Sequence, residues 1–280
     1  MPQLTPEFVE REYNNRALVP DHPEYFARWA RDSEFVRSTL PCELDLAYGT
    51  DPRHRMDFFP AARARGTLVF IHGGYWRTLD KSIFSWLAAA WVAAGVNVAL
   101  PNYRLAPQVG IGEIVDDVVM AMNWLMGSPS ALGEGRGEGN VVISGHSAGG
   151  HLTAALFAAP RDRLHFDPAR IVGGVPISGV FEFAPLKLFS FNADFRLDDE
   201  AVARLDLARR ARSIEAPLVV AAGAAESSEF QRQSRLLAEA WSPQVKSLIL
   251  LPGLNHFSVV DAFAERGQPL YEETLRLWDL

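Results

Sequence analysis

The feature that most constrains the fold is an alternation of short apolar runs with helical patterns from residue 67 onward. Six runs, many of them rich in β-branched residues, lie at 67–71, 96–100, 141–144, 171–177, 218–222 and 247–251. Helical patterns lie at 82–94, 111–126, 148–158, 229–241 and 268–278. Strands that are apolar throughout and joined by helices are typical of a parallel sheet with helices on both faces. Ligand sites in such folds lie outside the carboxyl ends of the strands.

The segments before residue 67 follow different patterns. Residues 1–40 predict amphipathic helices, one capped by Thr5 with Pro6 in its first turn, and another beginning at Pro23. Residues 42–48 and 54–59 alternate in polarity and are separated by the turn Gly49-Thr50-Asp51-Pro52. This pattern predicts a pair of antiparallel strands at the edge of the sheet.

One connection is longer than the others. Residues 178–215 have no strand pattern and carry several phenylalanines, so we expect a small helical insertion above the carboxyl edge of the sheet. A loop packed on the core is the alternative. The glycine-rich stretch 133–139 predicts a flexible surface loop. We therefore expect one domain over residues 1–280, with an N-terminal helical segment (1–40), a cap insertion (178–215) and a sheet of about eight strands.

Composition excludes several classes of protein. Of 280 residues, 48% are hydrophobic and 22% are charged, which supports a core and argues against disorder. The net charge is −7, from 27 Lys and Arg against 34 Asp and Glu, so nucleic acid is not an expected partner. The single cysteine, Cys42, suits a reducing compartment. The N-terminus lacks an apolar signal region, and no apolar stretch approaches the roughly 20 residues of a membrane span. We expect a cytoplasmic protein without a membrane partner.

The strongest chemical signal is Gly145-His146-Ser147-Ala148-Gly149-Gly150. It follows a predicted buried strand and opens a predicted helix, which is the context of the G-x-S-x-G nucleophile elbow. The sharp turn projects the serine hydroxyl above the sheet, at a helix N-terminus that favours negative charge. Ser147 is therefore the candidate nucleophile.

A second motif, His72-Gly73-Gly74-Tyr75-Trp76, follows the strand predicted at 67–71. Glycines leave backbone N–H groups open to an oxyanion, which acyl-transfer enzymes must stabilise. In this architecture one donor comes from the residue after the nucleophile, here Ala148, and another from this loop. Gly74 is the first candidate for the loop donor, with Tyr75 or Gly73 next. We expect His72 to orient the loop.

The chain order of a triad on this fold is serine, then acid, then histidine. Downstream of Ser147, only His256 follows the last predicted strand, so His256 is the candidate general base and acid. The acid should follow the strand at 218–222, where Glu226 comes first and Glu229 lies in the first helical turn. Glu226 is favoured because a carboxylate at the position of Glu229 also suits the helix dipole for structural reasons.

The sequence predicts neither a metal site nor a bound cofactor. There is no His-Glu-x-x-His motif, no Cys/His cluster and no Walker motif. The nearest dinucleotide-like pattern begins at Gly110 and Gly112, but Val115 takes the place of the third glycine. The expected partner is a small-molecule substrate, and a homodimer is compatible with the sequence.

With these motifs the chain resembles the α/β-hydrolase superfamily and, within it, the kynurenine formamidase (arylformamidase) group, whose characteristic motif is His-Gly-Gly-x-Trp. That motif here is His72 to Trp76. The resemblance extends over most of the chain, including Tyr13-Asn14-Asn15-Arg16-Ala17, the block from Gly145 to Leu152, Glu226-Ser227-Ser228-Glu229-Phe230 and Asn255-His256-Phe257. Members often have Asp where this chain has Glu226, whose extra methylene needs a slightly retracted backbone.

The resemblance implies hydrolysis of N-formyl-L-kynurenine to L-kynurenine and formate, in tryptophan degradation. Ser147, Glu226 and His256 would form the triad, and the formyl group would pass through a formyl-enzyme. Tyr75 and Trp76 are expected to wall a tight acyl pocket. The other expected substrate contacts are His146, Tyr103, Phe181 or a neighbouring phenylalanine such as Phe191, and Asn192 and Arg77 for the amino-acid head.

Two other functions use the same scaffold. A carboxylesterase acting on small aryl or short-acyl esters has the same catalytic residues, so the motifs do not separate it from a formamidase. A non-catalytic protein with a hydrolase fold is the other alternative, although such proteins usually lack a triad member. Reaction with a fluorophosphonate probe distinguishes this last class.

Overall fold

The computed structural model describes residues 4–127 and 139–279. Their strands form an eight-stranded sheet in the order β1-β2-β4-β3-β5-β6-β7-β8, in which β2 is antiparallel to both neighbours and the other pairs are parallel. The strands are β1 (Glu43–Ala47), β2 (Arg55–Phe59), β3 (Thr67–Ile71), β4 (Asn97–Pro101), β5 (Val141–His146), β6 (Ile171–Ile177), β7 (Leu218–Gly223) and β8 (Val245–Leu251). The predicted fold class is confirmed, and so is the antiparallel edge pair.

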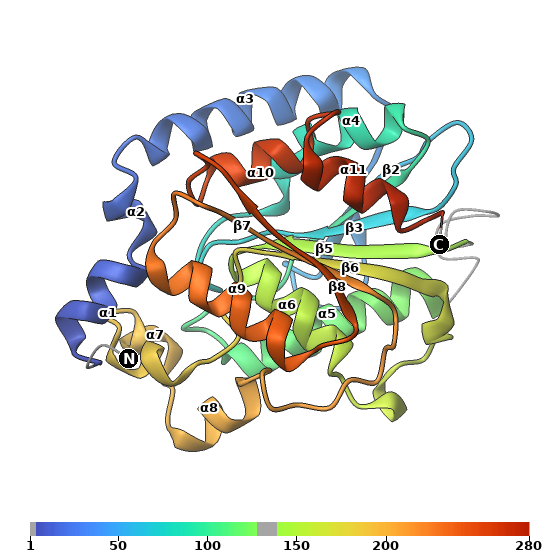
Figure 1. The fold of residues 1–280 in the computed structure, drawn as a ribbon. Coiled ribbons are helices and arrows are strands. Elements are labelled where there is room, and N and C mark those ends of the chain that lie inside the picture. Colours follow the sequence, from blue (N-terminus) through green and yellow to red (C-terminus); the bar gives the residue numbers. More distant parts are fainter. Residues whose placement is uncertain (1–3, 128–138, 280) are drawn as a thin grey trace.

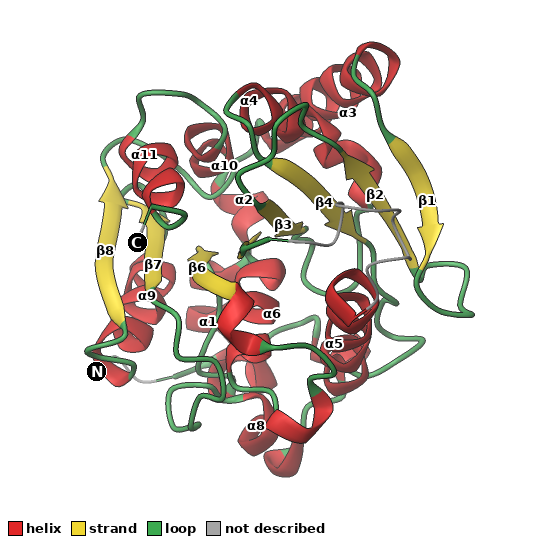
Figure 2. Cartoon of the chain, turned by 90° about the vertical axis from the view of Figure 1, so that its right-hand side faces the viewer, coloured by secondary structure: helices red, strands yellow, loops and turns green. Residues whose placement is uncertain are grey.

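Helices cover both faces of the sheet (Figures 1 and 2). On one face lie α3 (His22–Thr39), α4 (Ala88–Ala93), α10 (Ser258–Phe263) and α11 (Pro269–Arg276). On the other lie α5 (Ile111–Gly127), α6 (Ala148–Phe157) and α9 (Ser228–Ala240). Alternate residues of one strand contribute to two core clusters: Val69 packs in the cluster that contains α6, and Leu68 and Phe70 in the cluster that contains α10. Successive side chains of a strand point to opposite faces of the sheet, and both faces are buried here, so these strands carry continuous apolar runs.

The N-terminal helices α1 (Pro6–Tyr13) and α2 (Asn15–Leu18) lie at the carboxyl edge of the sheet (Figure 1). Thr5 caps α1 by accepting a hydrogen bond from the Phe8 N–H, as the sequence predicts. Asn14 ends α1 and caps α2, because its side chain accepts from the Ala17 N–H. This tight junction directs α2 toward the loop that follows β3.

Residues 178–215 contain η4 (Ala184–Leu188), α7 (Asn192–Phe195) and α8 (Asp199–Leu205). Phe181, Phe183 and Phe189 are buried in the same core cluster as Tyr13 of α1. The helical character expected for this segment is present, and its aromatic side chains attach it to α1.

One predicted helix differs in detail, and one observed helix was not predicted. The pattern at 82–94 forms a 3-10 helix, η1 (Lys81–Leu87), followed by α4. Asp80 caps the first turn of η1, which packs closely against α3. The sequence patterns did not predict the short helix α10. The glycine-rich stretch 133–139, predicted as a loop, lies almost entirely outside the described residues.

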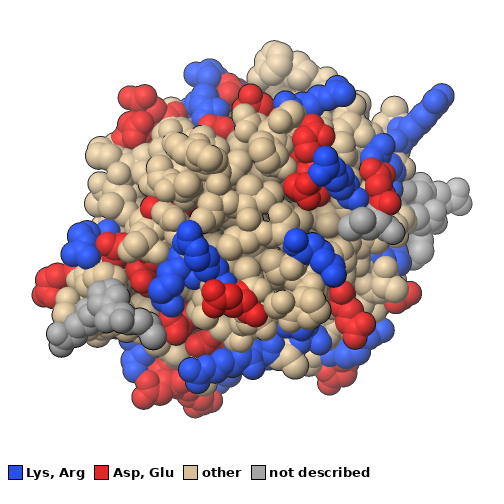
Figure 3. Space-filling view, viewed as in Figure 1, with Lys and Arg blue, Asp and Glu red and all other residues tan. Residues whose placement is uncertain are grey.

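The surface carries charges of both signs. On the face of Figure 3, Lys and Arg alternate with Asp and Glu around a wide uncharged area. Among helices in the described ranges, none is long and apolar enough to cross a membrane.

Candidate active site

Ser147 lies at a strained turn between β5 and α6. Its backbone has φ 56° and ψ −117°, a conformation that non-glycine residues rarely adopt. The turn is held by the Ser147 N–H, which donates to the Ile177 carbonyl at 2.8 Å. Gly149 allows α6 to pass beside β3, because a Cβ there would lie 1.9 Å from the Ile71 carbonyl oxygen. This is the geometry of a nucleophile elbow.

The Glu226 carboxylate is fully buried and accepts three hydrogen bonds. One oxygen accepts from the Ser178 hydroxyl at 2.5 Å and from the Gly223 N–H at 2.6 Å. The other lies 2.6 Å from Nδ1 of His256. The strand ends of β6 and β7 therefore fix the carboxylate, and the carboxylate fixes the imidazole with its Nε2 on the opposite side.

Glu229, the alternative acid, has a different set of contacts. It accepts from the Tyr13 hydroxyl at 2.8 Å and pairs with Arg232 at 2.8 Å. The structure therefore brings Glu226, and not Glu229, to His256.

Ser147, His146 and His256 line the same pocket. The rings of His146 and His256 lie 4.6 Å apart, and Phe230 packs on His256, also at 4.6 Å between centroids. Burial, with the nearby His256, holds the pKa of His146 well below its usual value, so His146 is neutral. In the described residues the Ser147 hydroxyl has no hydrogen-bond partner, and rotation about its single χ1 bond changes its direction.

The loop after β3 presents backbone N–H groups beside Ser147. A Cβ on Gly73 would lie 3.1 Å from Cβ of Ser147, so the loop backbone is directly against the serine. Gly74 has φ +109°, and its carbonyl accepts from the N–H groups of Arg77 and Thr78 at 3.1 and 3.0 Å. Within the described residues the N–H groups of Gly74, Tyr75 and Ala148 have no acceptor. They are available to an oxyanion.

The buried His72 side chain contacts the backbone of this loop. Its Nδ1 lies 2.8 Å from the Gly73 carbonyl oxygen and its Nε2 lies 3.0 Å from Oδ1 of Asn102. Burial lowers the pKa of His72 to about 4, so the ring is neutral near pH 7. His72 is a loop-orienting residue, as the sequence indicates.

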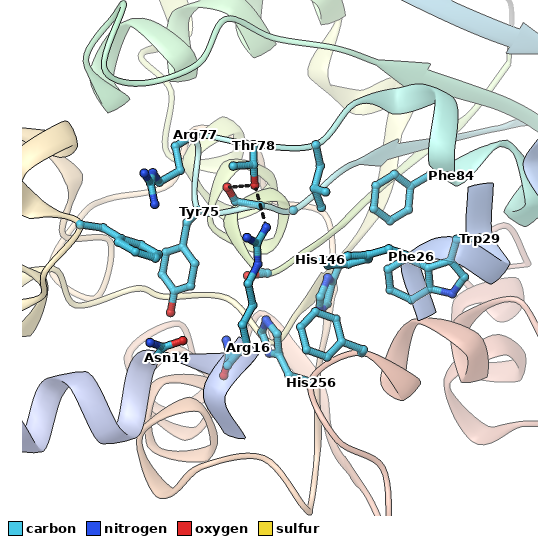
Figure 4. A pocket seen from close by; sticks show the side chains of 17 residues that line it. Asn14, Arg16, Phe26, Trp29, Tyr75, Arg77, Thr78, Phe84, His146 and His256 are labelled. Atoms are coloured by element: carbon cyan, nitrogen blue, oxygen red, sulfur yellow. Dashed lines mark hydrogen bonds between the residues drawn. The ribbon is translucent and has the colours of Figure 1, made fainter. Parts of the chain in front are cut away.

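The pocket beside Ser147 and His256 is narrow and partly open to solvent. Figure 4 shows it between the N-terminal helices, the loop after β3 and the histidine pair. Tyr75, Arg77 and Phe191, all expected near substrate, line it. The N-terminal segment also lines the pocket, through residues that the motifs did not predict: Asn14, Asn15, Arg16, Phe26 and Trp29. For Asn14, Asn15 and Arg16, the family resemblance over Tyr13 to Ala17 was the sequence feature that could have predicted a place in the site.

Four expected substrate contacts do not line this pocket. Trp76 is buried against His151 and Phe183, and Phe181 is buried in the core. The Tyr103 hydroxyl donates to the His72 carbonyl at 2.8 Å, under the loop. The Asn192 amide bonds to Lys187 and Leu197 within its own segment. These residues pack behind the pocket, since aromatic and amide groups pack in cores as readily as they bind ligands.

In the described part of the chain no group of three or more His, Cys, Asp or Glu side chains could hold a metal ion.

Comparisons with known proteins agree with this geometry. A family model for the α/β hydrolase fold matches residues 68–225. The kynurenine formamidase of Salmo salar is 23% identical over 98% of this chain and 95% of its own length, and that of Danio rerio is 24% identical over 88% and 85%. A solved structure from Silicibacter sp. TM1040, titled as a proposed thioesterase, has a TM-score of 0.85 and 31% identity, covering 97% of this chain and 99% of its own. The chain belongs to the α/β-hydrolase family, and its kynurenine formamidase relatives identify it as a hydrolase of amides or esters.

Proposed function

We propose that the protein hydrolyses aryl formamides, with N-formyl-L-kynurenine as the substrate and L-kynurenine and formate as the products. The observation that carries the proposal is the shared pocket of Ser147 and His256, in a chain similar to kynurenine formamidases along nearly its whole length. The close approach of Gly73 to Ser147 suits a small acyl group. Tyr75 and Phe191 offer flat apolar surfaces to an aryl leaving group.

In the proposed mechanism Ser147 Oγ attacks the formyl carbon while Nε2 of His256 takes its proton. The N–H groups of Gly74 and Ala148, with Tyr75 or Gly73 beside them, stabilise the oxyanion. Glu226 holds the imidazole through Nδ1 and stabilises the imidazolium. The C–N bond then breaks, and His256 returns the proton to the departing arylamine nitrogen.

The second half of the reaction releases formate. Water attacks the formyl-enzyme, His256 accepts one of its protons, and the second oxyanion occupies the same backbone site. The ester bond to Ser147 breaks and the proton returns to Oγ. We also propose that residues 1–280 act as one catalytic domain in which residues 178–215 form a small cap.

The second candidate is an esterase of small aryl or short-acyl esters. It is favoured by similarity to the Silicibacter protein, which is described as a proposed thioesterase. An ester needs less help with its leaving group than an arylamide, so the same residues serve both reactions.

The deciding experiment measures kcat/KM for N-formyl-L-kynurenine and for p-nitrophenyl esters from acetate to octanoate, with Ser147→Ala as the blank. We expect the formamide to have the highest kcat/KM and activity on the esters to fall with acyl length. A kcat/KM for the formamide well below that for the acetate ester would contradict the formamidase proposal and favour the esterase.

A further inference from the structure

Arg16 contributes a positive charge to the pocket that no carboxylate balances. In the described residues it has no ion pair, and its guanidinium donates one hydrogen bond, to Oγ1 of Thr78 at 3.3 Å. Figure 4 shows the Arg16 side chain extending from α2 toward Thr78, in the pocket that His146 and His256 also line. The guanidinium also lies 5.7 Å from the Phe26 ring centroid. The Arg16 guanidinium therefore lies at the pocket with several N–H donors that have no acceptor in the described residues.

The neighbouring arginine already has a carboxylate partner. Arg77 lines the same pocket, but it pairs with Asp194 at 2.7 Å and lies over the Phe191 ring at 4.2 Å. Burial and the charge of Arg77 lower the pKa of Arg16, which remains a cation near pH 7. A partly desolvated cation beside another cation is unfavourable, and an anion bound there would relieve it.

Asn15 adds an unsatisfied donor to the same wall. Its side chain is 3% exposed and lines the pocket, yet Nδ2 has no hydrogen-bond acceptor in the described residues. A buried amide without a partner costs free energy that an oxygen acceptor would recover. The neighbouring Asn14 differs, because its amide donates to Glu10 and accepts from Ala17.

We propose that Asn15 and Arg16 form a carboxylate subsite, so that the enzyme prefers aryl substrates with a carboxylate on the leaving group. The guanidinium offers the two parallel donors that a carboxylate accepts, and Asn15 offers a third. This inference rests on the proposed function for the identity of the acyl group, but the charge preference belongs to the pocket and holds for esters too. Arg16 is a specificity-determining residue, and it takes no part in bond breaking.

The test compares an anionic substrate with a neutral one of the same shape. The anionic substrate is N-formyl-L-kynurenine, and the neutral one is its carboxamide, in which an amide replaces the α-carboxylate. We expect Arg16→Met to lower kcat/KM for the anionic substrate by about 10- to 100-fold, mostly through KM, and to change kcat/KM for the carboxamide less than about twofold. Arg16→Lys keeps the charge and should retain part of the preference. Arg31→Met, at an exposed position of α3 outside the pocket, is the matched control.

Equal losses on both substrates, or none on either, would overturn the inference. The effect of salt on KM is an independent measurement. For the anionic substrate, the KM of the wild type should rise with ionic strength, and the KM of Arg16→Met should not change with it. Asn15→Leu should show the same substrate-selective loss. Because the Asn15 side chain is buried, its replacement can also change stability, so the unfolding midpoint of Asn15→Leu is measured as a control.

A second substrate pair separates this inference from the proposed function. Phenyl acetate and 3-acetoxybenzoate differ by a carboxylate on the leaving group and contain no formamide. If the wild type hydrolyses neither formamide but prefers 3-acetoxybenzoate in an Arg16-dependent manner, the formamidase proposal fails and the subsite stands. If it hydrolyses N-formylkynurenine with no Arg16-dependent charge preference in either pair, the subsite fails and the formamidase proposal stands.

Discussion

The carboxyl edge of the sheet and the helical segments that cover it are held in place by different kinds of contact. We call them the strand-end edge and the cover. The strand-end edge, which carries Ser147, Glu226 and His256, is fixed mainly through backbone groups, such as the Ile177 carbonyl and the Gly223 N–H. The cover consists of α1, α2 and residues 178–215. It is held to α9 by side chains: Gln233 accepts from the N–H groups of Phe181 and Glu182 and donates to the Tyr13 hydroxyl.

This difference separates two properties of the enzyme. Backbone contacts survive most side-chain changes, so the strand ends can keep one reaction geometry while the cover changes. Replacing the catalytic side chains at the edge should therefore reduce turnover with little loss of stability. Substitutions in the attachments of the cover should reduce stability or change substrate preference.

The largest expected effect is at Ser147. Its hydroxyl makes no hydrogen bond with the described residues, so Ser147→Ala removes the nucleophile and no structural contact. We expect kcat to fall by about four to six orders of magnitude, as for other serine triads, while the unfolding midpoint stays near that of the wild type. Turnover assays, fluorophosphonate labelling and thermal unfolding measure these effects. Turnover retained in the variant would remove Ser147 from the mechanism.

Glu226, in the loop after β7, and Glu229, in the first turn of α9, test the comparison directly. Glu226→Gln should lower kcat by roughly 10²- to 10⁴-fold, because a neutral amide does not hold the His256 tautomer or stabilise the imidazolium. Glu229→Gln should leave kcat within about threefold of the wild type but cost about 1–3 kcal/mol in unfolding free energy, since it weakens the contacts to Tyr13 and Arg232. Kinetics and urea unfolding of both variants give the ranking. The reverse ranking would reassign the acid.

The edge can also be disturbed through its backbone. A Cβ at Gly149 would lie 1.9 Å from the Ile71 carbonyl oxygen, whereas a Cβ at Gly112, an exposed position of α5, would meet nothing within 4 Å. Gly149→Ala should separate α6 from β3 and lower the unfolding free energy by several kcal/mol. Gly112→Ala should raise it by about 0.5–1 kcal/mol, because alanine restricts the unfolded chain. Equal stabilities would mean that the elbow is not held by this close approach.

The strand-end edge was more predictable from the sequence than the cover. Each edge residue occupies a short motif, such as Gly145 to Gly150, and the parallel sheet brings successive strand ends together. The boundaries of β3 were predicted at the residues observed, because a fully buried strand is apolar throughout. Chain order and position after the last strand favoured His256, and Glu226 was favoured over Glu229 because Glu229 lies in a first helical turn, where a carboxylate also has a structural role.

The cover was harder to predict because its contacts join segments far apart in the sequence. Tyr13 and Glu229 are separated by 216 positions, and no local pattern links them. Trp76, Tyr103 and Phe181 have the composition of a binding surface, but tertiary packing buries all three beneath the pocket wall. Asn15 and Arg16 lie on a four-residue helix that is too short to leave a periodic signal.

His151, one helical turn below Ser147, offers the smallest and most specific test, because it lies between the edge and the cover. Its ring packs on Trp76 and Phe183 at 5.3 and 4.7 Å, and neither ring nitrogen has a partner in the described residues. Burial lowers the pKa of His151 to about 3, below the value of about 6.5 in an unfolded chain. The unfolded state therefore takes up the proton first, so stability present above pH 6.5 is lost as the pH falls toward 3.

His151→Leu removes this titration and should flatten the fall of the unfolding free energy between pH 7 and pH 5, by up to about 1.4 kcal/mol per pH unit for one proton. Part of the slope should remain, because burial also lowers the pKa values of His72 and His146. Replacing the exposed His165 with Gln is the control, since its side chain meets solvent in both states. If urea unfolding gives the same slope for His151→Leu as for the wild type, the junction between edge and cover is not the acid-sensitive part of the fold.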